Sequence, residues 1–186
     1  MTEQLDDRAR DKRNRILDAA RFLVLRNGLR GTTMEAIARQ AHIAKPTLYA
    51  HFSDKDAVFT GIVEGLMRDM FAAYDSGMQT EGGVAQRIGK ALAGKYGAAA
   101  RLLDGSPHAD ELYSAHTRTA DKFRDHDLRV RAEIAAALAE AGVAEPAELT
   151  EMLLAAAGGI ARTAGSEARV RSWIEQLCER LIGSGR

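Results

Sequence analysis

The chain is poor in the residues that make disulfides, turns and strands. Its 186 residues include one cysteine, three prolines and 5% aromatic residues. The single cysteine, Cys178, cannot form an internal disulfide, which excludes a small scaffold stapled by disulfides. Few prolines and few aromatic residues, with abundant alanine, leucine, arginine and glutamate, favour helices over strands. We therefore expect an all-α fold.

Long apolar runs and an excess of one charge are also absent. Because no run of about 18 apolar residues occurs, and because the charged residues 1–15 lack the apolar core of a secretory signal, we expect a cytoplasmic protein. The 26 Lys and Arg balance 26 Asp and Glu, yet residues 1–56 carry +3 and the remainder −3. That asymmetry alone is weak support for a nucleic-acid partner. Phosphate-loop, dinucleotide, nucleophile-elbow and zinc-protease motifs are missing, so we expect no enzyme and no cofactor.

Residues 8–56 read as a compact set of short helices. Apolar residues share one face of a helix over 8–27, and Gly28 is placed to stop it in a left-handed conformation. A capping box, Thr32-x-x-Glu35, opens a second helix. A turn at 42–44 leads to a third helix over 45–52, with Pro46 in its first turn. A second capping box, Ser53-x-x-Asp56, starts a fourth helix.

The remainder, 57–186, reads as a second helical domain. A linker is expected at 76–83, followed by helices over 84–104, 109–119, 121–141 and 147–163, and a last helix capped by Ser166. The last helix carries a regular apolar stripe that begins at Val170 and includes Cys178, which we interpret as a small buried hydrophobe. Charged residues and histidines between 108 and 126 lack metal-ligand spacing, so no metal site is expected there.

Two short helices joined by a three- or four-residue turn predict a helix-turn-helix at about residues 32–52. Its second helix offers hydrogen-bonding side chains to a DNA groove, while Leu48 and Phe52 anchor it to the core. The stretch Thr32-Thr33-Met34-Glu35-Ala36-Ile37-Ala38, followed by Lys45-Pro46-Thr47-Leu48-Tyr49-Ala50-His51-Phe52-Ser53-Asp54-Lys55, resembles the DNA-binding domain of the tetracycline-repressor (TetR) family. The resemblance covers roughly residues 10–60 and implies about nine helices.

The resemblance assigns DNA contacts by position. Thr32 or Thr33 would touch phosphate at the start of the second helix. In the third helix, Lys45, Pro46 and Thr47 would contact bases or the DNA backbone. Tyr49 and His51 would bind phosphates, and Lys55 would bind the flanking backbone. The chain departs from the family pattern at His42, Ala44 and Pro46, and Ala44 cannot cap a helix through its side chain. The basic run 8–15 is interpreted as a solvated helix face, with a DNA-contacting arm as the alternative.

The resemblance also implies a homodimer with a small-molecule effector. The expected dimer interface comprises Leu153, Ile160, Val170, Trp173, Ile174, Leu177 and Leu181. The expected ligand-binding residues are Leu66, Met70, Phe71, Tyr74, Tyr96 and Phe123. Taken together, the sequence predicts a ligand-responsive, sequence-specific transcriptional regulator, most simply a repressor released from operator DNA by its effector. Two alternatives stay open: a constitutive DNA-binding protein without an effector, and an enzyme built on the helical bundle.

Overall fold

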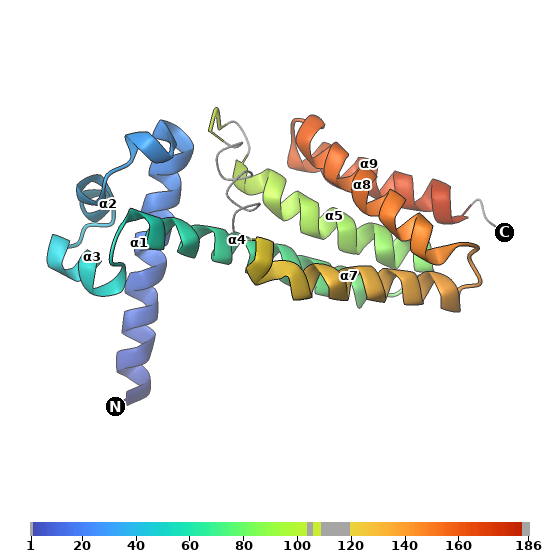
Figure 1. Ribbon diagram of the computed structural model, residues 1–186, viewed down its shortest axis with the longest axis horizontal. Helices are drawn as coiled ribbons and strands as arrows, with labels where there is room; N and C mark the ends of the chain where they lie inside the picture. The colour runs from blue at the N-terminus through green and yellow to red at the C-terminus, as the bar shows by residue number, and fades with distance from the viewer. Residues whose placement is uncertain (1, 104–105, 109–119, 184–186) are drawn as a thin grey trace. The chain divides into compact units, whose positions relative to one another are not determined.

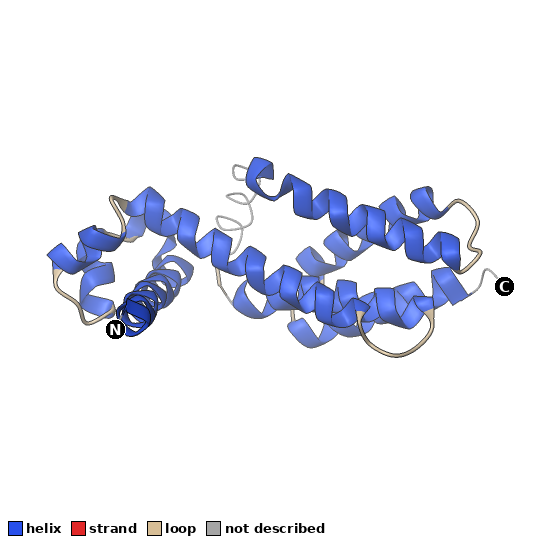
Figure 2. Cartoon of the chain, turned by 90° about the horizontal axis from the view of Figure 1, so that it is seen from below, coloured by secondary structure: helices blue, strands red, loops and turns tan. Residues whose placement is uncertain are grey.

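The computed structural model describes residues 2–103, 106–108 and 120–183, and within these ranges the chain forms eight helices and no strand (Figures 1 and 2). The helices are α1 (Thr2–Gly31), α2 (Met34–Gln40), α3 (Lys45–His51), α4 (Lys55–Met78), α5 (Val84–Leu103), α7 (Ala120–Glu140), α8 (Pro146–Thr163) and α9 (Glu167–Gly183). The all-α prediction is confirmed for this part of the chain. The short helix expected at 109–119 lies outside the described residues. None of the described helices is long and apolar enough to cross a membrane.

The chain divides into two compact units, and the division falls inside α4. The first unit holds the residues up to Gly65 together with 106–108, and the second holds 66–103 and 120–183. The sequence placed this boundary after Asp56, at the start of the same helix.

The first unit is built around one buried apolar face from each helix. Its buried apolar side chains include Ile16, Ala20 and Val24 from α1, Ile37 and Ala38 from α2, Leu48 from α3, and Val58 and Val63 from α4. Gly28 interrupts α1 with φ 75° and ψ 166°, a conformation open to glycine, and the chain then continues for one more turn to Gly31. The predicted stop at Gly28 is therefore a kink with positive φ, and the helical segment ends three residues later.

Both predicted helix caps lie one residue further along the chain. Thr33, not Thr32, caps α2, because its hydroxyl accepts the backbone N–H of Ala36 at 3.1 Å. Asp54, not Ser53, caps α4, because its carboxylate accepts the N–H of Ala57 at 2.8 Å. That hydrogen bond is the main reason why the pKa of Asp54 lies below its usual range. The expectation that Ala44 gives α3 no side-chain cap is confirmed.

In the second unit, α5 packs against α7, α8 and α9 (Figure 1). Small residues also permit a close approach between α4 and α5. A Cβ on Gly77 of α4 would lie 2.3 Å from the Cα of Ala91, and one on Gly94 of α5 would lie 2.7 Å from the carbonyl oxygen of Ala73. The glycines that weaken the helical pattern of α5 in the sequence are therefore positions of tight helix packing.

Candidate functional site

The helix-turn-helix is formed by α2, a four-residue turn and α3. Backbone hydrogen bonds from Ala41 to Ile37 (2.8 Å) and from Ile43 to Ala38 (3.0 Å) close the turn. His42 adopts φ 54° between them, in the left-handed region that favours glycine. A histidine accepts this left-handed conformation at a modest cost. The Arg15 guanidinium donates to the Ala41 carbonyl at 3.0 Å and so joins α1 to the turn.

The third helix buries one side and exposes the other. Leu48 is fully buried and Phe52, at the C-cap, is 3% exposed, so these residues hold α3 against the rest of the unit, as the sequence predicted. Arg13 of α1 stacks over the Phe52 ring at 4.4 Å. On the other side, Tyr49 is 48% exposed, Pro46 is exposed, and Thr47 and His51 are half-buried. The structure therefore brings Pro46, Thr47, Tyr49 and His51 together on one short helix.

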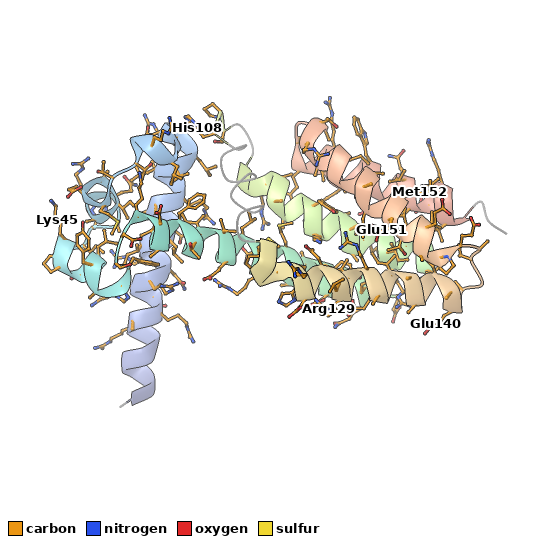
Figure 3. All side chains as sticks on the ribbon, in the orientation of Figure 1. Lys45, His108, Arg129, Glu140, Glu151 and Met152 are labelled. Carbon is orange, nitrogen blue, oxygen red and sulfur yellow. The ribbon has the colours of Figure 1, made fainter. Side chains whose placement is uncertain are left out.

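Lys45 begins α3 and lies at the outer edge of its unit (Figure 3). Its ammonium forms an ion pair with the Glu35 carboxylate of α2 at 3.0 Å, and the two side chains are 58% and 53% exposed. The hydrogen bond from Lys45 is the main reason why the pKa of Glu35 lies below its usual range. The sequence reasoning named Lys45 but missed its partner, because the spacing of ten residues has no regular pattern.

Two predicted DNA-contact residues have structural partners. Thr32 is 1% exposed, and its hydroxyl donates to the Gly28 carbonyl at 2.8 Å. Of the two threonines, Thr33 is therefore the exposed one at the start of α2. Lys55 is half-buried and donates to the Leu29 carbonyl at 2.9 Å, which ties the start of α4 to the end of α1. One of the three ammonium donors of Lys55 therefore serves the fold.

The predicted ligand-binding residues lie in the second unit, where Met70, Phe71 and Tyr74 are buried and Leu66, Tyr96 and Phe123 are half-buried. Phe71 and Tyr96 flank the ammonium of Lys95, at 5.1 and 5.6 Å from their ring centres. The ring of Phe71 also stacks on His126 at 4.6 Å. Sequence reasoning missed Lys95, because a lysine on a helix is ordinarily a solvated residue.

Tyr74 has different surroundings. The Arg129 guanidinium lies over its ring at 6.0 Å and is held by Asp75 (2.9 Å) and Glu133 (3.0 Å). Burial first, and then the Glu133 carboxylate, raise the pKa of Tyr74 well above its usual range. The Tyr74 hydroxyl is buried and makes no hydrogen bond of acceptable geometry with the residues that the structure describes. Phe71 and Tyr96 therefore lie beside Lys95, whereas Tyr74 lies beside Arg129.

The apolar stripe of α9 splits between two faces. Leu153, Val170 and Ile174 are fully buried inside the second unit, which corrects their assignment to a dimer interface. On the outer face, Trp173 is 46% exposed, Leu181 is 39% exposed, and Leu177 is half-buried. On α8, Ile160 is half-buried, and Met152, labelled in Figure 3, is 53% exposed. The sequence pattern grouped residues three and four positions apart into one apolar stripe. In the structure this stripe divides into a buried face and an exposed face of α9.

The described residues contain no group of three or more histidine, cysteine or acidic side chains that could hold a metal ion. Among the charged residues considered from the sequence, Asp110, Glu111 and His116 lie outside the described ranges.

Comparisons with known proteins converge on the N-terminal unit. The family "Bacterial regulatory proteins, tetR family" matches residues 16–62. The transcriptional repressor KstR2 of Rhodococcus jostii is 38% identical over 63 residues, which cover 34% of this chain and 31% of KstR2. The transcriptional regulator UidR of Escherichia coli is 36% identical over 63 residues, 34% of this chain and 32% of UidR. The matched segment thus spans about a third of the length of these curated relatives.

Solved structures match the fold over nearly the whole chain. A transcriptional regulator from Rhodococcus sp. RHA1 has a TM-score of 0.70 at 22% identity and covers 93% of this chain and 95% of its own. The ketosteroid transcriptional regulator KstR2 of Mycobacterium tuberculosis has a TM-score of 0.63 at 20% identity, with 92% and 93% covered. The relatives are named as regulators rather than enzymes. The helix-turn-helix thus lies within the segment that matches the tetR family, and the described helices share the fold of solved transcriptional regulators.

Proposed function

We propose that the protein is a sequence-specific DNA-binding transcriptional regulator that works as a homodimer and reads DNA with α3. The observation that carries this proposal is the two-sided character of α3. Leu48 and Phe52 fix the helix to the core, while Lys45, Thr47 and Tyr49 offer donors on a short helix with an accessible N-terminal end. A recognition helix needs this combination, because its N-terminal residues must enter the major groove without loosening the unit.

Lys45 must exchange partners when DNA binds. In the free protein its ammonium is paired with Glu35, and both side chains are more than half exposed, so the ion pair is easily broken in water. A phosphate or a guanine edge would then replace the carboxylate of Glu35. Glu35 would help to select DNA, because its carboxylate repels phosphate and accepts a hydrogen bond from cytosine.

Dimerisation is supported by the outer face of α8 and α9. Met152, Trp173 and Leu181 are large apolar side chains with exposures of 53%, 46% and 39%. A symmetric dimer would bury this face and present two α3 helices to half-sites about 34–36 Å apart. A small-molecule effector that binds a conformation with another spacing of these helices would release the DNA. A coupling of about 1–3 kcal/mol suffices for a 5- to 150-fold change in affinity.

The test is a salt titration of DNA affinity for three single variants. Lys45→Ala should reduce the slope of log affinity against log salt by about 1 for each phosphate that the lysine neutralises, or about 2 for a dimer. Tyr49→Phe should weaken binding to all sequences alike if its hydroxyl contacts phosphate. Lys90→Ala, at an exposed position of α5, is the control and should change neither quantity. Unchanged affinity and slope for both α3 variants would show that α3 does not contact DNA.

A further inference from the structure

Lys95 is a buried cation in the interior of the second unit. It lies on α5 and only 6% of the residue is exposed. Phe71 of α4 and Tyr96 of α5 present their rings to its ammonium. Among the residues that the structure describes, the ammonium has one hydrogen-bond partner, the Asp127 carboxylate of α7 at 3.3 Å. Two of its three donors therefore have no protein acceptor in these ranges.

Burial of this ammonium costs free energy. Loss of water around the ammonium lowers the pKa of Lys95 below its usual range, and the opposing attraction of Asp127 is the smaller effect. Arg131 and Arg129 add to the positive potential at the site. Both arginines already have carboxylate partners, because Arg131 binds Glu151 at 2.8 Å and Arg129 binds Asp75 and Glu133. A methionine, which has a similar volume and no charge, would cost less free energy to bury at this position.

The contact with Asp127 is the replaceable part of the cluster. The side chain of Asp127 is 34% exposed, whereas that of Lys95 is 7% exposed. Water therefore reaches the carboxylate, which can turn outward without being left unsolvated. The rings of Phe71 and Tyr96 stay beside the ammonium when Asp127 leaves. They offer apolar surface and a cation–π contact, but neither ring supplies an anion.

We propose that Lys95 anchors an effector site for a small molecule that carries an anionic group, such as a carboxylate or sulfonate, on an apolar body. The anionic group replaces Asp127 at the Lys95 ammonium, and the apolar body lies against Phe71 and Tyr96. A neutral ligand would not displace Asp127 and would gain no attraction from the ammonium, and a cationic ligand would face Lys95, Arg129 and Arg131 together. This inference rests on the proposed function for its regulatory meaning, but the anion site itself can be tested without DNA.

The experiment uses two fluorescent probes with the same apolar body. 8-Anilino-1-naphthalenesulfonate carries a sulfonate, and N-phenyl-1-naphthylamine lacks it. Both are titrated into the full chain and into Lys95→Met, Asp127→Asn and Lys90→Met. Lys90 is the matched control, because it lies on the same helix but is exposed. Melting curves check the fold of each variant, and Lys95→Met should melt at or above the temperature of the unchanged protein.

The proposal predicts that Lys95→Met weakens binding of the sulfonate probe about 10- to 100-fold, the range for loss of a charge-assisted hydrogen bond, and leaves the neutral probe unchanged. Asp127→Asn should tighten binding of the sulfonate probe, because a competing anion is removed. Lys90→Met should match the unchanged protein. Equal affinity of Lys95→Met and the unchanged protein for the sulfonate probe, with both folded, would overturn the proposal.

DNA affinity is measured in parallel, so that failure of the anion-site proposal can be distinguished from failure of the proposed DNA-binding function. If Lys95 controls binding of the sulfonate probe but no variant binds DNA specifically, the anion site stands and the proposed function fails. If DNA binding is specific but the sulfonate probe ignores Lys95, the effector inference fails and the proposed function stands.

Discussion

Replacement of Trp173 by glutamate should convert the proposed dimer into a monomer. Trp173 is 46% exposed on the outer face of α9, which leaves roughly 100 Å² of its surface for a partner subunit. At about 25 cal/mol per Å² this area contributes about 2.5 kcal/mol per subunit, or about 5 kcal/mol for a symmetric pair. The dimer dissociation constant should therefore rise by about 10³- to 10⁴-fold. The glutamate adds a further penalty, because its carboxylate would be buried without a partner.

Sedimentation velocity across a range of protein concentrations measures this change. Ser172→Glu is the matched control, because it adds the same charge at the neighbouring position, which is also exposed but lies about 100° further around the helix. Circular dichroism should show equal helix content for both variants, since neither position belongs to the core. A Trp173→Glu protein that remains dimeric at the same concentrations as Ser172→Glu would refute this reasoning.

Three further predictions concern the fold. Thr33→Ala should lower the free energy of unfolding by about 1 kcal/mol in urea denaturation, through loss of the α2 cap, whereas Ser53→Ala should have a smaller effect. Gly77→Ala should cost about 3 kcal/mol because its Cβ would overlap the Ala91 backbone, while Gly83→Ala, which meets nothing within 4 Å, should be near neutral. Burial raises the pKa of Cys178 to about 12, so the native thiol should stay protonated at pH 8. It should react with Ellman's reagent only after the protein unfolds. Rapid reaction of the native protein would contradict the burial of Cys178.

Local signals in the sequence were strong enough to predict the helices. Spacing of apolar residues and breaks at proline and glycine gave bounds close to those of α5, α7 and α8. Caps were harder to predict, because adjacent polar residues such as Thr32 and Thr33 compete for one position. The backbone decided between them by turning the Thr32 hydroxyl inward to the Gly28 carbonyl.

Contacts between distant residues could not be predicted from a single sequence. Lys45 binds Glu35, Lys55 binds Leu29 and Lys95 binds Asp127, at sequence separations of 10, 26 and 32. None of these sequence separations is the three- or four-residue spacing that brings side chains together on one helix. The partners therefore meet only through tertiary packing. The resemblance to a family assigned roles to residues of the helix-turn-helix, but it carried no information on which of their charges are already paired.

The central claim, sequence-specific binding by a dimer, is tested most directly by selection from random duplex DNA followed by an affinity titration. We expect a selected inverted repeat with half-sites about one helical turn apart, bound at least about 10³-fold more tightly than a scrambled duplex. Lys45→Ala should lose much of that preference. Selection that yields no shared sequence, with equal and weak binding to both duplexes, would contradict the claim.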